Sequence, residues 1–113
     1  MRSSTAPDAE IVQTEVAAKF FRGLGDATRL KIIQLLLDGE KNVGELVALT
    51  GVPQGRVSTH LSCLRWCGYV STARDGRRVY YRVADARVRE LVLLAQQIIA
   101  DNAKNICDCQ IIK

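Results

Sequence analysis

Two short helical patterns separated by a tight turn constrain the fold of this 113-residue chain more than any other feature. Apolar residues recur at helical spacing over 43–50, and Asn42 with Glu45 makes a capping-box start for that helix. Residues 51–53 (GVP) then end the first helix and open a second one over 54–67, because glycine favours a helix end and proline suits a first turn. Two helices joined this closely predict a helix-turn-helix.

A β-hairpin is predicted directly after the second helix. The runs 69–74 and 77–83 are rich in β-prone residues, and Asp75-Gly76 between them is a strong signal for a two-residue turn. A hairpin in this position forms the wing of a winged helix-turn-helix. The expected fold class is therefore mainly α with a β-hairpin wing.

Further helices are expected on both sides of this motif. Apolar periodicity predicts them over about 8–22, from Asp26 to a stop at Gly39, and over about 85–102. The chain is long enough for one domain. We expect that domain over 9–103, between a flexible tail at 1–8 and a cysteine-containing tail at 104–113.

The composition permits a nucleic-acid partner and argues against other classes. Sixteen Lys and Arg against 12 Asp and Glu give a net charge of +4, which is modestly basic. No apolar run is long enough to span a bilayer and no secretory signal is visible, so a cytoplasmic protein with reduced thiols and no membrane partner is expected. The single histidine stands in no hydrolase pattern, and no enzyme is expected.

The second helix of the motif has a polar face opposite its core positions Val57, Leu61 and Leu64. That polar face is made of short hydroxyls, an amide and guanidinium groups, which suit base edges and phosphates. The hairpin tip adds a compact positive patch. The candidate DNA-binding residues are Gln54, Arg56, Ser58, Thr59, Ser62 and Arg65 of the helix and Arg74, Arg77 and Arg78 of the hairpin.

Three stretches, in this order and spacing, resemble the ArsR/SmtB family of winged-helix metal-responsive repressors. They are GLGDATRLKIIQLLLDGEKNVGELVALTG, VSTHLSCLRWCGYV and DGRRVYYRVAD, and the similarity covers about residues 12–100. The resemblance implies a homodimer, built from the first and last helices, that binds a palindromic operator in double-stranded DNA and releases it when metal binds. The domain at 9–103 would then serve both DNA binding and dimerisation. Gly55 is a departure, because glycine weakens the first turn of the recognition helix.

Four cysteines form two pairs with metal-binding potential. Cys63 and Cys67 are four residues apart on the recognition helix, so they share one face, turned away from the DNA face, and can bind one soft ion together. Cys107 and Cys109 form a CxC pair near the C-terminus that can supply one or two more thiolates. The alternative is that the first pair are small buried residues and the second pair is incidental.

Two sensing sites of the family are missing from this sequence. The helix before the turn has no cysteine at 45–49, and the last helix has no histidine at 85–103. The LSCLRWC stretch instead resembles the cadmium- and lead-sensing (CmtR-type) branch, which has two cysteines four apart on the recognition helix and a tail cysteine from the other protomer. This resemblance implies Cys63, Cys67 and either tail cysteine as ligands.

Ligand number informs the choice of ion, since three thiolates suit Pb(II) or Hg(II) and four suit Cd(II) or Zn(II). We expect Cd(II) or Pb(II) as inducer, with an Hg(II)- or As(III)-responsive repressor of the same family as the alternative. A thiol redox sensor, whose cysteines oxidise to a disulfide, is the rival from another class. A metal-trafficking protein would leave the helix-turn-helix unexplained. His60 is expected to pack or lie beside DNA, and Asp108 is either an oxygen ligand or a solvated charge.

Overall fold

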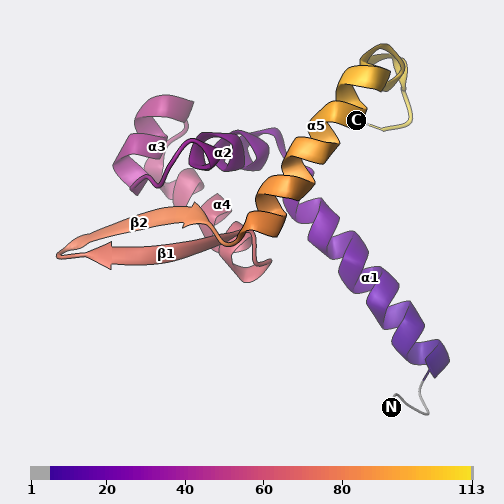
Figure 1. Cartoon of the computed structure of the whole chain (residues 1–113), viewed down its shortest axis with the longest axis horizontal. Helices are drawn as coiled ribbons and strands as arrows, with labels where there is room; N and C mark the ends of the chain where they lie inside the picture. The colour runs from indigo at the N-terminus through magenta and orange to yellow at the C-terminus, as the bar shows by residue number, and fades with distance from the viewer. Residues whose placement is uncertain (1–5, 113) are drawn as a thin grey trace.

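The protein is mainly helical with one hairpin, in a computed structural model that describes residues 6–112 and their side chains from residue 13 onward (Figure 1). The elements are α1 (Ala6–Leu24), α2 (Ala27–Leu37), α3 (Val43–Thr50), α4 (Gln54–Trp66), β1 (Val70–Asp75), β2 (Arg78–Val83) and α5 (Ala86–Asp108). This order confirms the predicted winged helix-turn-helix. The tail predicted at 1–8 lies outside the described residues over 1–5, and α1 already begins at Ala6.

Short-range hydrogen bonds define the helix-turn-helix formed by α3 and α4. Asn42 Oδ1 accepts from the backbone N–H of Glu45 at 2.8 Å, and Glu45 Oε1 accepts from the N–H of Asn42 at 2.9 Å, which confirms the predicted capping box. Gly51 ends α3 with a φ of +73°, a conformation that glycine adopts without strain. Pro53 occupies the N-cap position without a side-chain hydrogen bond to the helix, and α4 begins at Gln54.

The hairpin is confirmed, but its loop is shifted by one residue from the prediction. The strands are antiparallel and pair from Val70↔Val83 to Asp75↔Arg78. Asp75 therefore belongs to β1, and the two-residue loop is Gly76-Arg77 rather than Asp75-Gly76. The reason lies in Gly76, whose φ of +64° places glycine at the first loop position, as in a type II′ turn.

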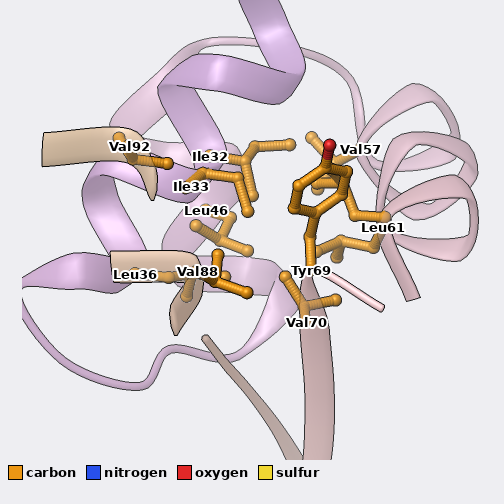
Figure 2. Close-up of a cluster of buried hydrophobic side chains, with 11 residues drawn as sticks. Ile32, Ile33, Leu36, Leu46, Val57, Leu61, Tyr69, Val70, Val88 and Val92 are labelled. Atoms are coloured by element: carbon orange, nitrogen blue, oxygen red, sulfur yellow. The ribbon is translucent and has the colours of Figure 1, made fainter. Parts of the chain in front are cut away.

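One hydrophobic cluster joins α2, α3, α4, the hairpin and the first turns of α5. Its buried side chains are Ile32, Ile33, Leu36, Leu46, Val57, Leu61, Leu64, Tyr69, Val70, Val88 and Val92. Figure 2 shows side chains from these elements pointing toward one another. We call this unit the body. Among the described side chains of α1, Phe20 and Leu24 pack against its margin.

Helix α1 and the remainder of α5 project from the body and diverge toward the two chain ends (Figure 1). We call them the arms. They expose large apolar side chains, namely Val16, Phe21, Leu93, Leu94, Ile98, Ile99 and Ile106. In the part of the chain that is described, no helix is both long and apolar enough to cross a membrane.

Helix α5 is longer than predicted and includes part of the expected tail. It continues to Asp108 instead of ending near residue 102. The sequence after Asn102 contains no glycine or proline to end the helix, and Lys104 pairs with Asp108 at 3.0 Å, one turn further on. Cys107 therefore lies in the last turn of α5, and Cys109 is the residue that caps it.

Candidate DNA-binding surface and thiol pair

Helix α4 has one face in the core and one face in solvent, as the sequence predicts. Val57, Leu61 and Leu64 are completely buried, and this anchors the helix on the body. The predicted DNA-binding side chains of α4 are all exposed, namely Gln54, Arg56, Ser58, Thr59, Ser62 and Arg65. The Thr59 hydroxyl donates its hydrogen to the Gly55 carbonyl oxygen at 3.0 Å. Toward a DNA partner, its oxygen can therefore act as a hydrogen-bond acceptor.

The hairpin extends away from the helices of the body (Figure 1). Its tip carries three arginines and is therefore positive. Arg74, Arg77 and Arg78 are exposed there, around the loop at Gly76. Among the ion pairs found within residues 13–112, none includes these three guanidinium groups. Such groups are available to phosphates of DNA.

Trp66, which is not among the predicted DNA-binding residues, belongs to the same surface. The indole is 91% exposed at the C-terminal end of α4. It lies nine residues after Val57, half a turn away from the core face. Ser62, Arg65 and Trp66 line a shallow cavity of about 400 Å³. The helical wheel contains this signal, because a tryptophan on a polar helix face has no place in the core.

Cys63 and Cys67 lie together at the C-terminal end of α4, and both side chains are half-buried. Burial is the main cause that raises the pKa of the Cys67 thiol, and the neighbouring Cys63 thiol adds to it. The positive charges of Lys19 and Arg29 act in the opposite direction. Two thiols held side by side on one helix offer two sulfur donors to one soft ion.

Helix α1 packs directly against Cys67 of the thiol pair. A Cβ atom on Gly23 would lie 3.2 Å from Cys67 Sγ and 3.2 Å from Tyr69 Cε2, so a larger residue would press on both. The Tyr69 hydroxyl donates to the Phe20 carbonyl oxygen at 2.8 Å. Burial, with a smaller contribution from the two thiols, raises the pKa of Tyr69 to about 12, so its hydroxyl stays protonated at neutral pH and remains a donor. The sequence did not predict this contact between distant segments.

The second cysteine pair lies at the far end of α5, away from α4 (Figure 1). Cys107 is exposed and Cys109 is half-buried, with a pKa lowered by the backbone N–H groups of Ile112 and Ile111. Asp108 pairs with Lys104. Among the described residues, no three His, Cys, Asp or Glu side chains come together in a group that could hold a metal. One chain thus presents the four predicted ligands as two separate pairs.

A hydrogen-bond network connects α1, α2 and α4. The Arg29 guanidinium donates to the carbonyl oxygens of Gly23 at 2.6 Å and Arg22 at 3.1 Å, at the end of α1. Its Nη1 also lies 3.3 Å from His60 Nδ1 on α4. The His60 ring is therefore packed against α2, which is one of the two roles expected for it. The Asp26 carboxylate lies 4.0 Å from the same ring nitrogen.

Comparison with known proteins identifies the family. The profile described as "Bacterial regulatory protein, arsR family" matches residues 26–72. The "Probable mercury resistance operon repressor" of Streptomyces lividans is 52% identical over 84% of this chain and 75% of its own length. The HTH-type transcriptional regulator CmtR of Mycobacterium tuberculosis is 42% identical over 80% of this chain and 77% of its own.

A solved structure gives the same answer for the fold. The homodimeric winged helix-turn-helix DNA-binding domain of a possible ArsR-family transcriptional regulator from Mycobacterium bovis has a TM-score of 0.75 and 31% identity. The match covers 90% of this chain and 92% of that one. The chain therefore belongs to the arsR family of bacterial regulatory proteins, and it is a winged helix-turn-helix transcriptional regulator rather than an enzyme.

Proposed function

We propose that the protein is a repressor that binds operator DNA as a homodimer and releases it when a soft heavy-metal ion binds cysteine thiolates. The observation that carries this proposal is the construction of α4, which has an exposed polar face and, at its C-terminal end, the half-buried thiol pair Cys63 and Cys67. A ligand of that pair acts on the helix that contacts DNA. The naming of the S. lividans relative as a mercury resistance operon repressor supports the proposal. We place this activity in the cytoplasm.

The DNA contacts divide between α4 and the hairpin. The hydroxyl, amide and guanidinium groups of α4 suit base edges in the major groove. The arginines at the hairpin tip provide sequence-independent contacts with phosphates, which bring most of the salt dependence. The net charge of +4 favours the same partner.

The dimer is proposed to form through the arms. Phe21, Leu94 and Ile98 are each more than half exposed, which is unusual for large apolar residues at helical spacing on a monomer. An open apolar groove of about 250 Å³ between α1, α2 and α5 continues this surface, with Leu24, Leu91 and Ile99 among its lining. A second copy would bury both features. The M. bovis domain is described as homodimeric, which supports this assignment.

The donors present fit a soft ion. Cys63 and Cys67 provide two adjacent sulfur atoms, and thiolates bind Cd(II), Pb(II) and Hg(II) in preference to hard cations. Cys107 and Cys109 sit on an arm, at the end of α5, and are proposed to supply the remaining thiolates from a second copy. When bound, the ion links thiolates from different elements. With three or four sulfur donors available, Cd(II) or Pb(II) is the proposed inducer.

Hg(II) is the second candidate, because a relative with 52% identity carries mercury resistance in its name. The number of thiolates that bind each ion separates the candidates. Titration of the reduced protein with Cd(II), Pb(II), Hg(II), As(III) and Zn(II), followed by thiolate-to-metal absorption, gives that number. Operator duplexes, first selected from a random pool by the metal-free protein, show in parallel which ion causes release.

The variants Cys63→Ser and Cys67→Ser test the proposal. Each should keep operator affinity without metal and lose release by the ion, because serine preserves the size of the side chain and removes the soft donor. Ser71→Cys, which adds a thiol on the hairpin instead, is a control for nonspecific thiol effects and should respond as the wild type. Release by peroxide with no effect of any ion would contradict the proposal and favour a redox sensor.

A further inference from the structure

The surroundings of Cys67 include residues of a different helix, α1. Where α1 passes Cys67, it carries Gly23, which is buried. A Cβ at this position would lie 3.2 Å from Cys67 Sγ, closer than an ordinary van der Waals contact. The φ of Gly23 is not in the left-handed region, so its backbone does not itself require glycine. Glycine weakens a helix, and its presence here is explained by the close approach to the thiol.

Tyr69 fastens the same turn of α1. Its side chain is completely buried, its hydroxyl donates to the carbonyl oxygen of Phe20 at 2.8 Å, and its ring stacks on the Phe20 ring with centroids 4.5 Å apart. Phe20 and Gly23 are three residues apart, hence one helical turn. Tyr69 and Cys67 therefore both lie against one turn of α1.

We propose that Gly23 and Tyr69 are positioning residues of the thiol site, through which ligation of Cys67 is transmitted to α1. The inference rests on the proposed function and deepens it by naming the route. Because a Cβ on Gly23 would lie only 3.2 Å from Sγ, Cys67 is a close neighbour of this turn, and a change in what Sγ binds on this side acts on the turn directly. Since α1 also carries Phe21 in the proposed dimer surface, such a movement reaches the second copy.

The thiol also has an open side. A cavity of about 520 Å³ between α1 and the end of α4 is lined by Val16, Lys19, Phe20, Trp66 and Cys67. Phe20 is shared between this cavity and the contact with Tyr69. Helix α1 forms one wall of this cavity. A ligand that reaches Cys67 through it would therefore pass beside the turn of α1 that contains Phe20 and Gly23.

The first test measures the rate at which iodoacetamide alkylates each thiol of the reduced, metal-free protein. Trypsin cleaves after Arg65, between Cys63 and Cys67, so the two thiols are quantified in separate peptides and Cys63 serves as internal reference. We expect Gly23→Ala to slow alkylation of Cys67 about fivefold, because the added Cβ restricts access to Sγ. Gly25→Ala is the matched control, since its Cβ would meet only backbone atoms at 3.5 Å or more.

The second test measures the fold-change in operator affinity caused by Cd(II). Tyr69→Phe keeps the ring stack and removes the hydrogen bond to Phe20. We expect it to bind operator without the ion to within about twofold of wild type and to show a response to the ion at least about fivefold smaller, the low end of ordinary allosteric coupling. Tyr80→Phe removes a hydroxyl from the hairpin and should respond as the wild type.

A Cys67 alkylation rate unchanged by Gly23→Ala would overturn the role of Gly23, and a wild-type response in Tyr69→Phe would overturn transmission through Tyr69. If Tyr69→Phe does not fold, the same release measurement on Gly23→Ala decides, with a reduced response expected. If wild-type protein releases operator with none of Cd(II), Pb(II) and Hg(II), the proposed function fails. The alkylation test uses no ion and still shows whether Gly23 controls access to Cys67.

Discussion

The body and the arms differ in how much of their structure one chain completes. The body buries its apolar side chains and caps its helices with its own groups, such as Asn42 and Asp26. The arms leave large apolar residues in solvent, and the CxC pair lies at the end of one of them. The body thus forms the candidate DNA-binding surface unaided, whereas the arms form the proposed dimer surface, which a second copy would complete. The thiol pair lies where the two regions meet.

The largest expected effect is on the body. Ile32→Ala should lower the free energy of unfolding by about 2–5 kcal/mol, because Ile32 is completely buried and its truncation leaves a cavity. Ile106→Ala, in the last turns of an arm and half exposed, is the matched control and should cost less than about 0.5 kcal/mol. Denaturant unfolding measures both. Equal losses in the two variants would remove the distinction between body and arms.

The next effect concerns the arms. Ile98→Glu should weaken dimerisation about 100-fold, because a charge would be buried in the proposed interface, while the fold of each chain stays intact. Sedimentation equilibrium measures the dimer and circular dichroism the fold. Gln97→Glu adds the same charge one residue away and should have a much smaller effect. A dimer unaffected by Ile98→Glu would show that α5 does not form the interface.

The hairpin tip should affect DNA binding without affecting the dimer. Arg77→Ala should weaken operator affinity about tenfold and reduce the slope of log affinity against log salt by about one, as expected for a lost phosphate contact. Lys104→Ala removes one positive charge at the far end of α5 and serves as control. Fluorescence anisotropy at several salt concentrations gives both quantities, and an identical salt slope in Arg77→Ala would exclude the contact.

The smallest effect lies at the junction of α1 and the body. Asp26 accepts from the Arg29 backbone N–H at 3.0 Å, and this bond lowers the pKa of the carboxyl group. Its stabilising effect is present above the ordinary aspartate pKa of about 3.9 and is lost as the pH falls through the lower folded-state value. Asp26→Ala should cost about 1 kcal/mol at pH 7. Asp26→Asn should retain most of the cap and lose the pH dependence, which unfolding experiments from pH 2 to 7 measure.

The features that could be predicted from the sequence are those fixed by neighbours in the chain. The capping box at Asn42 and the core face of α4 follow from spacing alone. The predicted loop of the hairpin was wrong by one residue. Either neighbour of Gly76 can form a two-residue loop with it, and only the pairing of Asp75 with Arg78 shows that the loop is Gly76-Arg77. The length of α5 was underestimated, since a polar last turn resembles a tail when no residue ends the helix.

The surroundings of the candidate site depend on distant segments and could not be predicted. The i,i+4 spacing places Cys63 beside Cys67, but no local pattern shows that Gly23 packs on Cys67 or that Tyr69 binds Phe20. These contacts join residues more than 40 positions apart. The separation of the two cysteine pairs likewise depends on the direction in which α5 leaves the body.

The most direct test of the central claim is operator affinity measured with and without one equivalent of Cd(II) per chain, in wild type and in Cys67→Ser. We predict that the ion weakens operator binding of the wild type at least about fivefold, and that operator weakens ion binding by the same factor, since coupling between two sites is reciprocal. Cys67→Ser should bind operator equally with and without the ion. Operator affinity that none of Cd(II), Pb(II) and Hg(II) changes, or a Cys67→Ser protein that releases operator as the wild type does, would contradict the account.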